Sequence, residues 1–139
     1  MTDATIEPLG RGHLDRLIAL IEAEGWDVYP DDPERTYRAL TAPGGTTLVA
    51  IAGEWVVGAI QVQSDGLIQA HLSLLLIDRD WRGAGLGSTL LREGLERAGG
   101  LQLDIRTRTE GYYERLGASR SLGFRVMRED LGLRGANPG

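Results

Sequence analysis

The residues of this chain with the clearest chemical potential are three closely spaced glycines. Gly83, Gly85 and Gly87 follow the apolar run Leu74–Ile77 and precede an amphipathic helix. Glycine lets the backbone approach a ligand without interference from a Cβ, and the first N–H groups of a helix lack intrahelical acceptors. Their partial positive charge suits an anion, phosphate above all. The pattern therefore predicts a phosphate-binding turn between a buried strand and a helix.

The glycine spacing separates this turn from two common phosphate loops. The dinucleotide fingerprint G-x-G-x-x-G does not fit, because the glycines here follow the order G-x-G-x-G. A Walker A loop requires a lysine, and all 15 basic residues of this chain are arginine. A tight turn without any ligand is the alternative that the glycines alone leave open.

Composition excludes several other kinds of site. The chain has no cysteine, which removes thiolate nucleophiles, disulfides and cysteine-based zinc sites. Its only histidines are His13 and His71, so we expect no metal centre. The net charge of −5 disfavours a nucleic-acid partner. No apolar run approaches the ~20 residues of a membrane span, and the first residues do not resemble a signal peptide, so we expect a cytoplasmic protein with no membrane partner.

The elements that would position the glycine turn follow from periodicity and turn residues. Helices are predicted over His13–Glu24, about Pro33–Ala42, from the glycine turn to about Ala98, and over Glu110–Leu116. Strands are predicted over Thr2–Pro8, Thr46–Ala52, Trp55–Gln63, Leu67–Ile77, Leu101–Thr107 and Phe124–Leu131. No repeat or linker divides the chain, so we expect one α/β domain of the α+β type over residues 1–139, with a flexible tail at about 132–139.

This element order and two motifs resemble the GNAT superfamily of N-acetyltransferases. The family's pyrophosphate loop reads [Arg/Gln]-x-x-Gly-x-[Gly/Ala], and Arg82–Gly87 matches it. The stretch Tyr112–Gly117 resembles the family's Phe-Tyr-x-x-x-Gly-Phe signature. The resemblance extends from about residue 3 to about residue 131. It implies a mixed, mostly antiparallel central sheet of about 6–7 strands flanked by about four helices.

The resemblance also implies acetyl-CoA as a cosubstrate. In the family, amides of the glycine loop hold the pyrophosphate, and the preceding strand splays from its neighbour and pairs with the pantetheine arm. A free N–H there, expected at Leu76, would stabilise the tetrahedral oxyanion. Arg82 would contact phosphate or brace the loop. The implied coenzyme contacts are Leu75, Leu76, Ile77, Arg82, Gly83, Ala84, Gly85, Leu86, Gly87 and Ser88.

Acid and base chemistry is assigned by the same resemblance. Tyr113 aligns with the tyrosine that protonates the departing thiolate, a task suited to a phenol of pKa near 10. Packing alone is the alternative role for Tyr113. His71, with an ordinary pKa near 6.5, is a candidate base for the amine. Asp104 and Glu110 are further candidates, and some family members use a water chain instead.

The acceptor side of the family lies in the loop between the first two helices. Here that loop carries Trp26, Asp27 and Tyr29, and aromatic and acidic side chains suit a cationic amine. An ordinary surface loop is the alternative. The predicted function is an acetyl-CoA-dependent N-acetyltransferase that acts on a primary amine of a small molecule or peptide, by direct attack in a ternary complex. The second hypothesis is a catalytically inactive acyl-CoA sensor or interaction module. The family also allows a homodimer.

Overall fold

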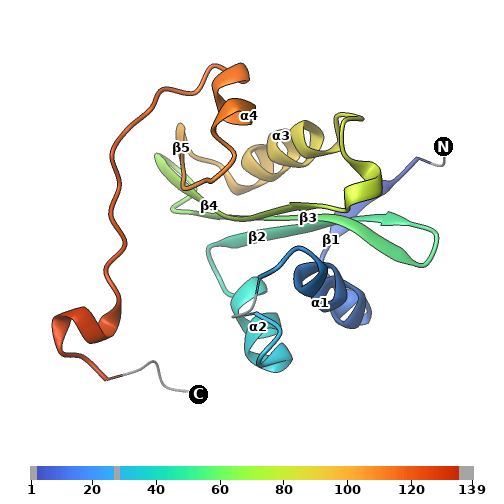
Figure 1. Ribbon diagram of the computed structural model, residues 1–139, viewed down its shortest axis with the longest axis horizontal. Helices are drawn as coiled ribbons and strands as arrows, with labels where there is room; N and C mark the ends of the chain where they lie inside the picture. Colours follow the sequence, from blue (N-terminus) through green and yellow to red (C-terminus); the bar gives the residue numbers. More distant parts are fainter. Residues whose placement is uncertain (1–2, 27–28, 135–139) are drawn as a thin grey trace. The chain divides into compact units, whose positions relative to one another are not determined.

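A five-stranded sheet forms the centre of the computed structural model, which describes residues 3–26 and 29–134. In spatial order the strands are β1 (Thr5–Pro8), β2 (Gly45–Ala52), β3 (Trp55–Ser64), β4 (Gln69–Ile77) and β5 (Gln102–Ile105). The first four run antiparallel to their neighbours, and β5 is parallel to β4. Helices α1 (Leu14–Ala23) and α2 (Pro33–Leu40) cover one face, and α3 (Leu86–Ala98) covers the other (Figure 1). The predicted mixed, mostly antiparallel α/β fold is confirmed.

Local chemistry explains where the helices on the first face begin and which side they bury. In α1, Leu14, Leu17 and Ile21 recur every three or four residues and are buried. Helix α2 starts at Pro33, where the missing N–H costs nothing, and the Asp32 carboxylate accepts a hydrogen bond from the Arg35 N–H at 3.1 Å. Helix α1 therefore has an apolar side that faces the sheet, and α2 has a capped start.

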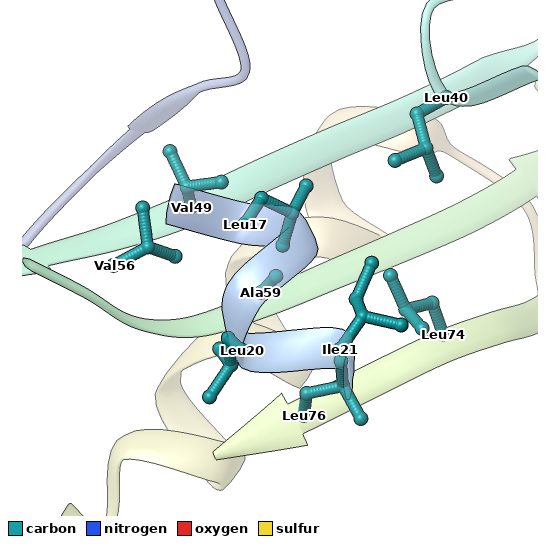
Figure 2. Packing of buried hydrophobic residues seen from close by; sticks show 9 residues of the cluster. All are labelled: Leu17, Leu20, Ile21, Leu40, Val49, Val56, Ala59, Leu74 and Leu76. Carbon is teal, nitrogen blue, oxygen red and sulfur yellow. The ribbon is translucent and has the colours of Figure 1, made fainter. Parts of the chain in front are cut away.

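The main core lies between α1, α2 and the sheet (Figure 2). Its buried residues are Leu17, Leu20, Ile21, Leu40, Val49, Val56, Ala59, Leu74 and Leu76. Two of these come from β4, at alternate positions, so this face of β4 packs under the end of α1. The intervening residues Leu75 and Ile77 turn toward the face that α3 covers.

Helix α3 lies close to β3 on the opposite face. A Cβ added to Gly94 would lie 3.1 Å from Ile60 Cδ1 and 3.3 Å from Val62 Cγ2. Glycine at this position therefore permits the close approach of helix and strand. At its end, Gly99 has a φ of +77°, and a Cβ there would lie 2.7 Å from the Gly66 carbonyl oxygen. The helix thus approaches β3 closely at Gly94 and the turn between β3 and β4 at Gly99.

The chain divides into two compact units, residues 1–105 and 106–139. The first contains the sheet and α1 to α3. In the described part of the second, α4 (Glu110–Arg115) and the 3₁₀ turn η3 (Arg128–Leu131) are the regular elements. Residues 118–127 between them form neither helix nor strand and are exposed.

The strand predicted over Phe124–Leu131 is wrong, because residues 124–127 are irregular and η3 follows them. Leu122, Phe124 and Val126 do alternate as in a strand, yet they are 60–85% exposed. A strand requires a hydrogen-bonded neighbour, and the described residues provide none for this segment. The described sheet accordingly has five strands instead of the expected 6–7.

Candidate active site

The candidate site begins at an open edge of β4. Strand β5 pairs with β4 only from Gln69 to Leu72, where Leu72 faces Ile105. Strand β3 continues to pair with β4 as far as Ile77. Residues 73–77 therefore have no strand on the β5 side among residues 3–105. This is the splayed strand that the family resemblance implies.

Strand β4 has a β-bulge at the point where β5 separates from it. Gln61 pairs with Leu74 and Val62 pairs with Leu72, which leaves Ser73 as the extra residue of β4. The Ser73 hydroxyl lies 2.6 Å from Gln61 Oε1 and 3.2 Å from the Gln61 carbonyl oxygen. The Gln61 side-chain amide donates to the Ala39 carbonyl of α2 at 3.1 Å. Gln61 is only 3% exposed, so a buried polar bridge connects α2, the bulge and the start of the open edge.

The hydrogen-bond alternation of β4 identifies which backbone groups face this edge. The Asp78 N–H donates to the Val57 carbonyl at 2.8 Å. In an antiparallel pair the residues alternate between bonding to the partner strand and facing away from it. Given the register Ile77–Gly58, Leu76–Ala59 and Leu75–Ile60, the N–H of Leu76 faces β3. The N–H groups of Leu75 and Ile77 face the open edge.

The free N–H expected at Leu76 is therefore found at its two neighbours in β4 instead. Leu76 was expected to carry the free N–H, but its backbone is engaged with β3 and its side chain is 4% exposed in the core. Leu75 and Ile77 have the required backbone orientation. The periodicity of a strand does not say which of its two edges is bonded, so the sequence could not make this distinction.

The glycine turn follows β4 directly and leads into α3. Gly83 and Gly85 have φ values of +83° and +87°, which disfavour other residues, and a Cβ at either position would meet no atom within 4 Å. Among the described residues, none accepts a hydrogen bond from the N–H groups of Gly83, Ala84, Gly85, Leu86 or Gly87. Ser88 lies half-buried in the first turn of α3. The turn thus presents donors and open space at a helix N-terminus, which suits a pyrophosphate.

Arg82 braces the turn from the side of the sheet. Its Nε donates to the Ile77 carbonyl at 3.1 Å, and its Nη2 pairs with Glu24 Oε1. Glu24 follows the last residue of α1, and its side chain is only 13% exposed. Of the two roles considered for Arg82, this geometry supports bracing.

The acceptor loop is described in part. The rings of Trp26 and Tyr29 are 5.8 Å apart and tilted by 56°. Trp26 is 37% exposed, whereas Tyr29 packs against the core. Asp27 lies outside the described residues. The loop therefore combines one accessible aromatic ring with a structural one.

His71 lies far from the open edge along β4. It is exposed at the paired end of the strand, opposite Asp104 and four residues before Leu75. At about 3.3 Å per residue, roughly 13 Å of strand separates His71 from Leu75. His71 could therefore serve an amine at that edge only through intervening water. The side chain of Glu110 lies outside the described part of the chain.

Tyr113 belongs to the second unit, on α4. Its ring meets that of Tyr112 edge to face, with centroids 5.0 Å apart. Burial raises the pKa of the Tyr113 phenol, and the Tyr112 phenol raises it further. A phenol of ordinary or raised pKa is protonated at neutral pH, as a proton donor must be.

None of the helices in residues 3–26 and 29–134 is long and apolar enough to cross a membrane. Over the same residues, no three carboxylate or histidine side chains gather in a way that could hold a metal ion.

The structure thus brings the end of β4, the glycine turn and the end of α1 together in the first unit. Two residues of this arrangement, Glu24 and Gln61, lie outside the sequence prediction. Gln61 carried a signal, since a glutamine within an apolar strand needs buried partners. Glu24 carried none, because only the fold brings it to Arg82.

Comparison with known proteins agrees with this geometry. The profile of the acetyltransferase (GNAT) domain matches residues 21–130, most of the chain. No curated protein matches this chain. A Deinococcus radiodurans R1 protein, whose identity as an acetyltransferase is itself inferred, is 26% identical with a TM-score of 0.69, and the match covers 98% of this chain and 100% of that one.

Two more distant structures share the fold. An acetyltransferase from Trypanosoma brucei is 18% identical with a TM-score of 0.72, over 90% of this chain and 99% of that one. A ribosomal-protein-alanine N-acetyltransferase from Brucella melitensis biovar Abortus 2308 is 18% identical with a TM-score of 0.71, over 91% and 99%. The family match, together with the splayed strand and the glycine turn, identifies this chain as a member of the GNAT acetyltransferases.

Proposed function

We propose that this GNAT enzyme transfers the acetyl group of acetyl-CoA to a primary amine by direct attack in a ternary complex. The observation that carries the proposal is the continuity of β4 with the glycine turn. The open edge of β4 offers backbone groups to an extended pantetheine arm, and the turn offers unpaired N–H groups to a pyrophosphate. Coenzyme A carries both groups in one molecule.

The coenzyme would run from the turn back along β4. Ile77 lies nearest the turn, but its carbonyl already accepts from Arg82. Its N–H and the backbone of Leu75 remain to pair with the pantetheine arm. Leu75 lies two residues farther from the turn than Ile77, which is about 7 Å along the strand. We therefore assign the thioester oxygen, and the oxyanion that forms from it, to the Leu75 N–H.

The reaction then requires two proton movements. The neutral amine nitrogen attacks the thioester carbon, a C–N bond forms, and the C–S bond breaks as the tetrahedral intermediate collapses. The thiolate takes a proton from the Tyr113 phenol, and the nitrogen loses its surplus proton to water or a base. Without a cysteine in the chain, no acyl-enzyme on a thiol can intervene. The Tyr113 phenol, whose pKa burial raises, is protonated at neutral pH and so has the proton to give.

A turnover assay with a small amine panel tests this proposal. Acetyl-CoA is mixed with the protein and phenethylamine, spermidine or a short peptide with a free N-terminus, and the released coenzyme thiol is measured. Thiol release should depend on the amine and should match acetylated product found by mass spectrometry. If acetyl-CoA binds but no amine is acetylated, the second hypothesis, an acyl-CoA sensor or interaction module, replaces this one.

A further inference from the structure

We infer that Glu24 receives the acceptor amine: a carboxylate oxygen of Glu24 accepts a hydrogen bond from the amine nitrogen and holds it toward the open edge of β4. The inference rests on the proposed function and adds a residue that contacts the amine, which the proposed function leaves unassigned. Glu24 lies at the junction of α1 with the acceptor loop. Its role would be to bind and orient the substrate.

The first supporting observation is the position of α1 over β4. Leu17, Leu20 and Ile21 of α1 share a buried cluster with Leu74 and Leu76 of β4 (Figure 2). The C-terminal end of α1 therefore packs over the part of β4 that β5 leaves unpaired. Glu24 comes three residues after Ile21, directly beyond the end of the helix.

The second observation is the guanidinium group of Arg82. Its Nε donates to the Ile77 carbonyl, and its Nη2 pairs with Glu24 Oε1. These two nitrogens belong to one planar group and are separated by a single carbon. The Glu24 carboxylate must therefore lie beside the Ile77 carbonyl, at the end of the open edge.

The third observation is that one carboxylate oxygen of Glu24 is available as a hydrogen-bond acceptor. Within the described residues, Glu24 Oε2 has no hydrogen-bond partner, and it is not among the fully buried oxygens. A primary amine of pKa near 10.4 arrives mostly as an ammonium ion, whose N–H groups seek such an oxygen. The Arg82 pair fixes the carboxylate in one place, so less side-chain entropy is lost when the amine binds.

Other acids near the turn are less suited to this role. Asp78 Oδ1 accepts the Asp80 N–H at 2.9 Å and so stabilises the chain after β4. Asp80 is exposed. Glu24 is the carboxylate that the described structure ties to both the acceptor loop and the open edge.

The test compares Glu24→Gln with Glu22→Gln, a matched change at an exposed position in the last turn of α1. For the best amine of the panel, Glu24→Gln should raise KM roughly tenfold or more, as expected for a lost hydrogen bond to a charged group. The Kd of acetyl-CoA, measured by calorimetry, should stay within about twofold. Glu22→Gln should resemble the wild type in both measurements.

A second variant, Glu24→Asp, keeps the charge but withdraws the carboxylate by one methylene. It should raise the amine KM less than Glu24→Gln does, and it provides the readout if Glu24→Gln fails to fold. An unchanged amine KM in either folded variant would overturn the inference. So would a defect confined to acetyl-CoA binding, which would reduce Glu24 to a brace for Arg82. Failure of the proposed function is separate, since it appears as a wild-type protein that acetylates no amine.

Discussion

Tyr113 carries a phenol whose pKa is raised by burial and by its neighbour Tyr112. If this phenol protonates the thiolate, Tyr113→Phe should lower kcat roughly a hundredfold, within the usual range for a lost general acid. The Kd of acetyl-CoA should be unchanged. Tyr112→Phe, which leaves the Tyr113 hydroxyl in place, should change kcat by less than about threefold. Steady-state kinetics and calorimetry on the three proteins provide both numbers.

The direction of the pKa shift also determines a pH dependence. The acid is active while protonated, so wild-type kcat should fall as pH rises through a value above the ordinary phenol pKa of about 10. In Tyr113→Phe that decline should disappear, because the group that titrates is gone. A decline that persists in the variant would assign the titration to another residue and contradict the acid role.

Single residues also show what the sequence could and could not predict. The turn at Gly83 and Gly85 could be predicted from glycine spacing, because positive φ favours glycine, whereas Arg82 was singled out by the family motif. The expectation of a free N–H at Leu76 came from the family resemblance, and strand alternation could not correct it, because a period of two does not say which edge is bonded. Glu24 could not be found, since 58 residues separate it from Arg82 in the chain.

At the scale of elements, the bulge of β4 lies where the unpaired edge of that strand begins. Ser73→Ala would leave the buried Gln61 Oε1 without its donor, and this should lower the free energy of unfolding by about 1–3 kcal/mol. It should also lower kcat, because Leu75 lies two residues beyond the bulge. Ser73→Thr keeps a hydroxyl and should retain more of both. Urea unfolding and steady-state kinetics test the two effects, and a Ser73→Ala protein with wild-type stability and kcat would contradict them.

Elements with local signals were predicted well, and those that depend on a partner were not. The predicted strands Thr46–Ala52 and Trp55–Gln63 differ from β2 and β3 by one residue at one end each. The turn glycines and the apolar alternation suffice to define them. The segment 124–131 has strand-like alternation too, but hydrogen bonding to a neighbour decides whether a strand forms.

On the scale of the whole molecule, one sheet lies between the proposed acceptor side and the start of α3. Helix α1 ends and helix α2 begins at the acceptor loop on one face, while the glycine turn starts α3 on the other (Figure 1). Strand β4 runs between these faces and contributes to both, with Leu74 and Leu76 in the core and the backbone of Leu75 and Ile77 at the open edge. An acyl donor and an amine could therefore meet at β4 from opposite sides.

The most direct test of this account is calorimetric titration of the purified protein with acetyl-CoA, in parallel with Gly85→Glu and Gly53→Glu. Both glycines have positive φ and open surroundings, so the two changes impose similar strain and the same charge, but only Gly85 lies in the turn. We predict micromolar binding by the wild type and by Gly53→Glu, and its loss in Gly85→Glu. No binding by the wild type up to millimolar acetyl-CoA, or equal binding by all three proteins, would contradict the assignment of the glycine turn as the pyrophosphate site.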